Sequence, residues 1–215
     1  MKGKYLIVTA LLVATVWFGL VGLGSAATTT WGPTGLINVP TADVNVPGRL
    51  DLAMHHLKSR TSLVASYGVL DTLEAGIGVH NLGGDSELSI NVKGVLIEET
   101  ADLPALALGL SGVEDTTYYM VASKSLPGLG IRGHLGIGSG RVDGLFIGAE
   151  KVLNPVTVTT SGQGMRIPVT TLMAEWDGSD LNIGADFAFS YGLKVRVMIN
   201  DMDSLGVGLQ LSAQL

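Results

Sequence analysis

Apolar and polar residues alternate along most of the chain after residue 48. In the clearest stretch, Leu205, Val207, Leu209 and Leu211 alternate with glycine, glutamine and serine. Successive side chains of a strand point to opposite faces, so this pattern predicts a β-strand with one apolar and one polar face. The same period recurs along the chain, and no segment has the 3.6-residue period of an amphipathic helix. The strands expected from it are 49–57, 61–67, 72–80, 87–97, 103–113, 118–125, 130–138, 142–152, 170–176, 181–190, 193–200 and 204–215.

Short turns separate these segments. They are rich in glycine, asparagine and aspartate, which supply the positive φ angles of tight hairpins. Residues 154–168 form the single long connection, which is either a loop or a further hairpin. The pattern therefore predicts an all-β chain of about 12 strands, in the range 10–14, and full closure would remove the exposed edges of so long an antiparallel sheet.

The N-terminus has the pattern of an export signal. Lys2 and Lys4 precede an apolar run over residues 6–23, and small residues at 25–27 offer a cleavage site. We predict a signal peptide over 1–27; the alternative is an uncleaved anchor, since the apolar run is long enough to cross a bilayer. Pro40 and Pro47 exclude residues 28–48 from a central strand. This lead-in segment is expected to cross or lie against the periplasmic mouth of a barrel that spans 49–215, the alternative being a disordered lead-in.

Composition favours a barrel in a membrane. Only 15% of the residues are charged, whereas soluble domains have about 25%. The faces opposite the aliphatic residues carry glycine, serine and alanine, which suit a narrow lumen, while the aliphatic faces suit lipid. We therefore predict a transmembrane antiparallel β-barrel in the outer membrane, in contact with its lipid. A net charge of −6 argues against nucleic acid as a partner.

Charged residues within the strands are expected to point into the lumen, because a charge against hydrocarbon is costly. Both signs occur among them. Two interpretations follow: either these residues pair and fill a closed interior, or they line a narrow polar conduit. The lumen-facing candidates are Asp51, Glu74, Lys93, Arg132, Glu150, Glu175, Asp186, Lys194 and Arg196.

Signs of catalysis are weak. His55 and His56 are adjacent in a strand and face opposite sides, while His80 and His134 stand alone. No serine lies in a nucleophile elbow or a spaced triad. The chain has no cysteine, and no ligands are spaced for a metal. We expect no cofactor, no metal and no enzymatic activity.

One segment resembles a known family. Residues 31–43 (WGPTGLINVPTAD), followed by a glycine and a strand, are similar to the opening of the YjbH-like outer-membrane proteins, which are associated with exopolysaccharide biosynthesis. Residues 67–76 (YGVLDTLEAG) and 174–184 (AEWDGSDLNIG) also resemble that family. The chain is shorter than typical members and ends in Leu215 rather than an aromatic residue. The residues that carry the resemblance are Gly35, Leu36, Ile37, Pro40, Thr41, Ala42 and Gly48.

The resemblance implies a role in exopolysaccharide secretion or envelope organisation, with polysaccharide or envelope-export proteins as partners. Two alternatives remain from the sequence. A passive narrow pore would need only an open lumen. An outer-membrane lipid-modifying enzyme would need a serine and a histidine that the fold brings together.

Overall fold

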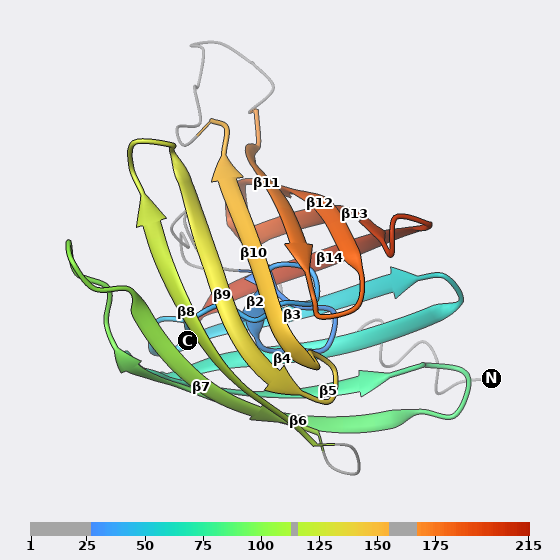
Figure 1. Cartoon of the computed structure of the whole chain (residues 1–215). Coiled ribbons are helices and arrows are strands. Elements are labelled where there is room, and N and C mark those ends of the chain that lie inside the picture. The colour runs from blue at the N-terminus through green and yellow to red at the C-terminus, as the bar shows by residue number, and fades with distance from the viewer. Residues whose placement is uncertain (1–26, 113–115, 155–166) are drawn as a thin grey trace.

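Twelve strands in the described part of the chain close into an antiparallel barrel (Figure 1). The computed structural model describes residues 27–112, 116–154 and 167–215, so nearly all of the expected signal peptide and most of the long connection lie outside the described residues. The expected strand pattern and the all-β fold are confirmed. The barrel strands are β3 (Arg49–Leu57), β4 (Arg60–Leu70), β5 (Leu73–His80), β6 (Glu87–Ile97), β7 (Ala105–Ser111), β8 (Thr117–Leu126), β9 (Ile131–Ser139), β10 (Gly144–Val152), β11 (Val169–Trp176), β12 (Leu181–Ala188), β13 (Leu193–Asn200) and β14 (Ser204–Gln214).

Each barrel strand pairs with its neighbours in the sequence, and the last strand returns to the first. In this closing ladder Gly206 of β14 faces Leu57 of β3, and Gln214 faces Arg49. The barrel therefore has two rims. We call the one where β3 begins and β14 ends the first rim, and the one where β3 ends and β14 begins the second rim. A 3₁₀ turn, Ser190–Gly192, joins β12 to β13 at the first rim.

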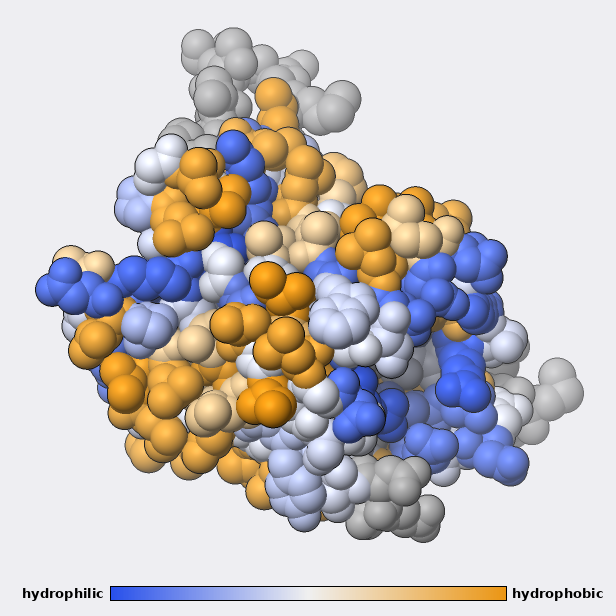
Figure 2. Space-filling view, viewed as in Figure 1, coloured by the Kyte–Doolittle hydropathy of each residue, from blue (hydrophilic) through white to orange (hydrophobic). Residues whose placement is uncertain are grey.

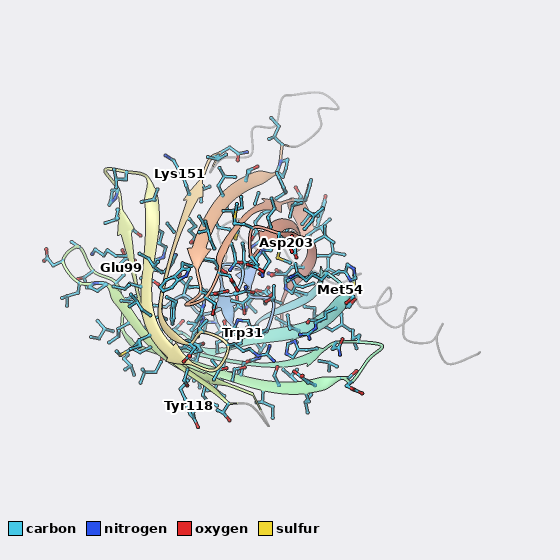
Figure 3. The ribbon with its side chains drawn as sticks, turned by 45° about the vertical axis from the view of Figure 1, so that its right-hand side comes forward. Trp31, Met54, Glu99, Tyr118, Lys151 and Asp203 are labelled. Carbon is cyan, nitrogen blue, oxygen red and sulfur yellow. The ribbon has the colours of Figure 1, made fainter. Side chains whose placement is uncertain are left out.

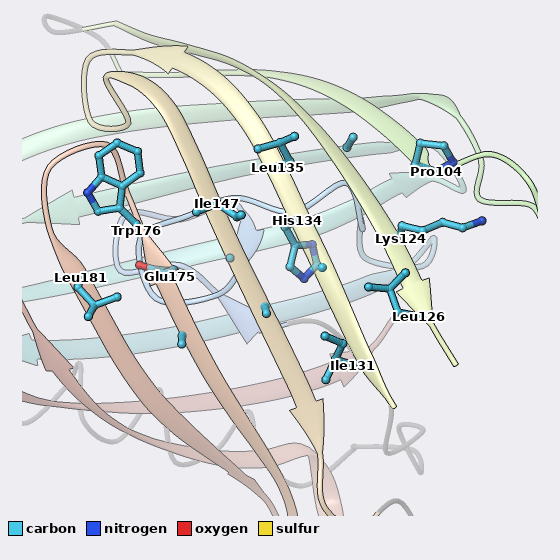
Figure 4. A pocket seen from close by; sticks show the side chains of 15 residues that line it. Pro104, Lys124, Leu126, Ile131, His134, Leu135, Ile147, Glu175, Trp176 and Leu181 are labelled. Carbon is cyan, nitrogen blue, oxygen red and sulfur yellow. The ribbon is translucent and has the colours of Figure 1, made fainter. Parts of the chain in front are cut away.

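The outer face is aliphatic. On β14, Leu205, Val207 and Leu209 are 67%, 49% and 42% exposed, while the alternate residues are mostly buried. Figure 4 shows the same for β9 and β10 elsewhere in the barrel, where Leu135 and Ile147 lie on the outer face. In Figure 2 hydrophobic side chains gather over the left flank of the barrel, and hydrophilic ones gather at the right, where β3 and β5 end. Among the described residues there is no helix long and apolar enough to span a bilayer.

The interior is filled by the chain's own N-terminal segment. Residues 27–48, which we call the plug, lie within the ring of strands (Figure 1). Two short strands, β1 (Ala27–Thr28) and β2 (Thr34–Gly35), pair inside it. Leu36, Ile37 and Val39 are at most 1% exposed. We expected this segment to cross or lie against the periplasmic mouth of the barrel; it lies deeper, within the lumen, because its apolar residues need burial and the lumen provides it.

The plug also changes the character of the inner face. Alternation predicted a polar lumen, yet β8 and β10 direct Tyr119, Val121 and Phe146 inward, each at most 4% exposed. They pack in one cluster with Trp31 and Val39 of the plug. Figure 3 places Trp31 in the middle of the ring and Tyr118 at its periphery. The core of this barrel is therefore partly apolar, and it lies between the plug and the wall.

Candidate functional site

The charged residues expected in the lumen lie on the inner face, and most contact the plug. Six of them are at most 5% exposed, namely Asp51, Glu74, Lys93, Glu175, Asp186 and Arg196. Arg132, Glu150 and Lys194 are partly exposed. Both signs occur side by side, so the wall offers hydrogen-bond donors and acceptors to the plug without a large net charge.

Glu175 of β11 holds the middle of the plug. Its Oε2 accepts hydrogen bonds from the backbone amides of Ile37 and Val39, at 2.9 and 3.1 Å. Its Oε1 accepts from the amide of Asn38 at 2.6 Å and from Asn182 Nδ2 at 3.1 Å. One buried carboxylate thus satisfies three consecutive main-chain donors, which have no strand or helix to satisfy them.

A lysine and a glutamate hold the other side of the plug. Glu74 of β5 accepts hydrogen bonds from the amides of Thr34 and Asn45, at 2.9 and 3.0 Å. Lys93 of β6 donates to the carbonyl oxygens of Thr34 and Thr41, at 2.8 and 3.2 Å, and also to Thr34 Oγ1. The Lys93 amine lies 3.8 Å from Glu74 Oε1, so the two charges compensate each other as they bind the plug.

Arg196 of β13 joins the plug to the wall through four hydrogen bonds, two to the wall and two to the plug. Its guanidinium makes a two-point ion pair with Asp186 of β12, at 2.7 and 2.8 Å. The remaining nitrogen, Nη1, donates to the carbonyl oxygens of Thr28, at 2.9 Å, and of Leu36. The planar fork of arginine suits such simultaneous contacts, and the ion pair fixes its orientation.

Two glycines of the wall make room for the apolar part of the plug. A Cβ atom at Gly148 would lie 2.4 Å from Leu36 Cδ1, and one at Gly184 would lie 3.0 Å from Ile37 Cδ1. Leu36 and Ile37 also pack on Met173. From composition alone, the inner glycines indicated only a narrow lumen. In the structure they leave room for specific side chains of the plug.

An arginine at the first rim ties the plug to a loop. Arg132 of β9 binds Asp43 of the plug at 2.8 and 3.2 Å and also pairs with Glu99 in the connection between β6 and β7. The Ser125 amide donates to Glu99 at 2.7 Å. Although partial burial of Glu99 acts against its charged form, the hydrogen bonds from Arg132 and Ser125 hold the pKa of this carboxyl below its usual range. We call Asp43, Glu99 and Arg132 the first-rim latch.

Sequence reasoning missed two arrangements on the inner face. Arg49 pairs with Asp51 at 2.9 Å. Because the two residues are two positions apart in a strand, they point to the same face, and this spacing could have indicated the pair. His134 is not isolated: its Nδ1 lies 2.8 Å from Ser123 Oγ, and its Nε2 lies 3.9 Å from Glu150 Oε1. These three residues sit on neighbouring strands, β8, β9 and β10, so only the register could reveal them.

This serine, histidine and glutamate do not form a working triad in the closed barrel. The 3.9 Å separation between His134 and Glu150 exceeds a hydrogen bond. Ser123 is fully buried, and its Oγ accepts a hydrogen bond from the amide of Ala42 at 2.8 Å. A substrate cannot approach this oxygen while the plug is in place.

A polar cavity of about 480 Å³ lies at the second rim. We call it the vestibule. Its floor includes Thr30 and Trp31 of the plug, and its wall includes His55 and His80, which the sequence had left unconnected. Within residues 27–112, 116–154 and 167–215, no three histidine, aspartate or glutamate side chains are grouped as a metal site.

Solved structures with a similar fold are outer-membrane proteins. The KdgM porin is 12% identical, with a TM-score of 0.51, and covers 76% of this chain and 98% of its own. The same porin in complex with disordered oligogalacturonate is 11% identical, with a TM-score of 0.50, covering 78% of this chain and 99% of its own. The Acinetobacter baumannii outer membrane protein Omp33 is 12% identical, with a TM-score of 0.47, covering 78% and 97%. No curated protein sequence matches the chain.

A closed β-barrel with an aliphatic exterior is the structure of an outer-membrane protein. This chain has that structure, and its location is therefore the outer membrane. The sequence profile of the YjbH family, described as exopolysaccharide biosynthesis protein YbjH, matches residues 27–171. The matched region begins at the first described residue of the plug and continues through the first eight barrel strands. It includes the motif at residues 35–42, which the structure places in the lumen. The chain is thus a member of the YjbH family.

Proposed function

We propose that this protein is a plugged outer-membrane barrel that serves exopolysaccharide secretion or envelope organisation without catalysing a reaction. Membership of the YjbH family supports the connection with exopolysaccharide. The observation that carries the proposal is the plug itself, whose main chain is bound by Glu74, Lys93, Glu175 and Arg196. In this state the plug occupies the lumen, and on this proposal passage requires the plug to shift.

Hydrogen bonding explains how the plug can be bound in the lumen and still be released. The contacts of its main chain to the wall are polar, and water can replace them when the plug leaves. A passive narrow pore, the first alternative, would conduct ions through the intact protein regardless of plug movement. A lipid-modifying enzyme, the second alternative, would use Ser123 and His134, which the plug covers in the closed barrel.

A disulfide lock tests the proposal. The chain has no cysteine, and the 2.8 Å contact between Ser123 Oγ and the Ala42 amide places these two residues within the reach of a disulfide. Cells that carry Ala42→Cys/Ser123→Cys should release little exopolysaccharide under oxidising conditions and recover on reduction. The two single variants are the controls.

Heat-modifiable gel mobility should first establish that each variant folds. Normal polysaccharide release by the oxidised, folded double variant would overturn the proposal. Conductance of the purified barrel that is high and unchanged by the lock would favour the passive pore instead. Loss of lipid hydrolysis on Ser123→Ala would favour the enzyme.

A further inference from the structure

The vestibule has the composition of a binding site rather than of a packing defect. Only Trp31 and Leu57 among its lining residues are apolar. Its volume of about 480 Å³ lies within the range of roughly 300–1,000 Å³ that is usual for small-molecule pockets. It is formed where β3, β4, β5 and β13 reach the second rim, so rigid strand ends hold much of its wall.

The charge of the vestibule is opposite to that of the protein. Lys58, Arg60 and Arg141 line it with one acid, Glu87, whereas the whole chain carries a net charge of −6. Arg141 Nη2 lies 3.5 Å from Glu87, and the exposed Lys58 lies 3.9 Å from Asp203 at the rim. Within the part of the chain that the structure describes, the side chain of Arg60 has neither a hydrogen-bond partner nor an ion-pair partner, although its main chain pairs with Leu57. The guanidinium is therefore available to an anion.

The neutral groups of the wall suit a ligand with many hydroxyls. His80 lies 3.1 Å from Ser62 Oγ and 2.8 Å from Ser89 Oγ, which fixes the ring at the side of the cavity. Ser62, Asn81 and Asn200 add hydroxyl and amide groups, each of which can donate or accept. Trp31 closes the floor from below: it is 3% exposed, and its Nε1 donates to the Asn38 carbonyl oxygen at 2.7 Å. The hydroxyl, amide and imidazole groups of the wall can hydrogen-bond to the hydroxyls of a sugar.

We propose that the vestibule binds an anionic saccharide of one or two sugar units, with its carboxylate on Arg60 and its hydroxyls on the neutral wall. This inference rests on the proposed function for the biological source of the sugar, but its binding chemistry stands on the cavity alone. The ligand would also touch Thr30 and Trp31, which belong to the plug. A ligand bound at the second rim would thus be in direct contact with the plug, the segment that occupies the lumen.

Calorimetry on the purified full chain in detergent tests the proposal with a matched pair of probes. Cellobiouronic acid and cellobiose differ only in a carboxylate that replaces a hydroxymethyl group. A hydrogen bond to a charged group contributes about 1.5–3 kcal/mol, so the acid should bind at least about tenfold more tightly than cellobiose. Its affinity should fall as salt is added, because the attraction of an exposed arginine is screened.

Variants assign the interaction to this cavity. Arg60→Gln should weaken binding of the acid about tenfold and leave cellobiose unaffected, and Arg141→Gln should weaken it by a smaller factor, since Glu87 already shares that charge. Lys151→Gln removes one exposed positive charge near the first rim and should change neither affinity. Unaltered heat-modifiable mobility establishes that each variant is folded.

Three results would overturn the proposal: no binding of either sugar, equal affinity for both, or full affinity in Arg60→Gln. Inorganic phosphate is a further probe. If it binds as tightly as the uronic acid, the vestibule is a simple anion site and the saccharide is excluded. These outcomes are independent of the disulfide lock, which concerns the plug at Ala42 and not the vestibule.

Discussion

Replacing Glu175 with glutamine should release the plug. The carboxylate accepts four hydrogen bonds, three of them from the backbone amides of Ile37, Asn38 and Val39. Glutamine keeps one acceptor oxygen and puts an NH₂ donor in place of the other. Because Oε1 accepts from one plug amide and from Asn182 while Oε2 accepts from two plug amides, the plug loses one or two of its hydrogen bonds. At about 1.5–3 kcal/mol for each hydrogen bond to a charged group, the loss is about 1.5–6 kcal/mol. That shifts the ratio of bound to released plug by a factor of about 10–10⁴.

Thiol labelling measures this shift directly. Ala42 is 2% exposed within the closed barrel, so an Ala42→Cys variant should react with a thiol reagent only when the plug leaves. The chain has no other cysteine to interfere. In the Glu175→Gln background the labelling rate should rise by the factor given above, up to the rate of an exposed thiol.

Glu150→Gln is the matched control. Glu150 is also on the inner face, but its nearest charged neighbour is His134 at 3.9 Å, and none of the hydrogen bonds found in the described residues joins it to the plug. The same chemical change there should alter labelling little. Equal labelling rates in the two backgrounds would show that Glu175 does not hold the plug, and the account of the lumen given above would fail.

Three further predictions concern the barrel around the plug. An even number of strands puts both ends of the barrel, where β3 begins and β14 ends, at one rim, which we expect to be periplasmic, so an epitope inserted at Gly84 should be labelled on intact cells and one at Gly128 should not; the reverse would overturn this orientation. Leu209→Arg should cost about 2–4 kcal/mol, because the outer face of β14 meets lipid there, whereas Leu205→Arg near the second rim should cost about 0–1 kcal/mol; urea titration in vesicles compares them. The lowered pKa of Glu99 stabilises the folded loop above the ordinary carboxyl pKa, and this contribution is lost as pH falls through the folded value. Between about pH 5 and pH 3, the melting temperature of the native chain should therefore fall more than that of Glu99→Gln, and parallel curves would contradict the latch.

The barrel was predictable because period-two alternation is a local property. Leu209 and Gln210 differ by one position, and each one's face follows from its neighbours alone. Alternation likewise predicted that Glu175 and Arg196 lie on the inner face. It did not reveal what they bind, because their partners are main-chain atoms. Every residue has such atoms, so no sequence pattern identifies them.

The plug escaped prediction for a related reason. Pro40 and Pro47 excluded a central strand, but they did not say where the segment lies. Its position follows from long-range fit, such as Leu36 over the bare backbone of Gly148. The inward position of Phe146 could not be predicted either. An aromatic side chain that points inward is incompatible with a water-filled lumen, and it is reasonable only opposite Trp31 and Val39.

The charged residues of the wall bind the main chain of the plug, and this has a consequence for how the family can vary. Glu175 and Arg196 contact amides and carbonyl oxygens that any residue supplies. Many substitutions within residues 27–48 should therefore preserve the seal, provided that small residues stay where space is short. A single insertion or deletion between Thr34 and Val39 would instead move every following amide away from its acceptor. We therefore expect natural variation to change the length of this segment less than its composition.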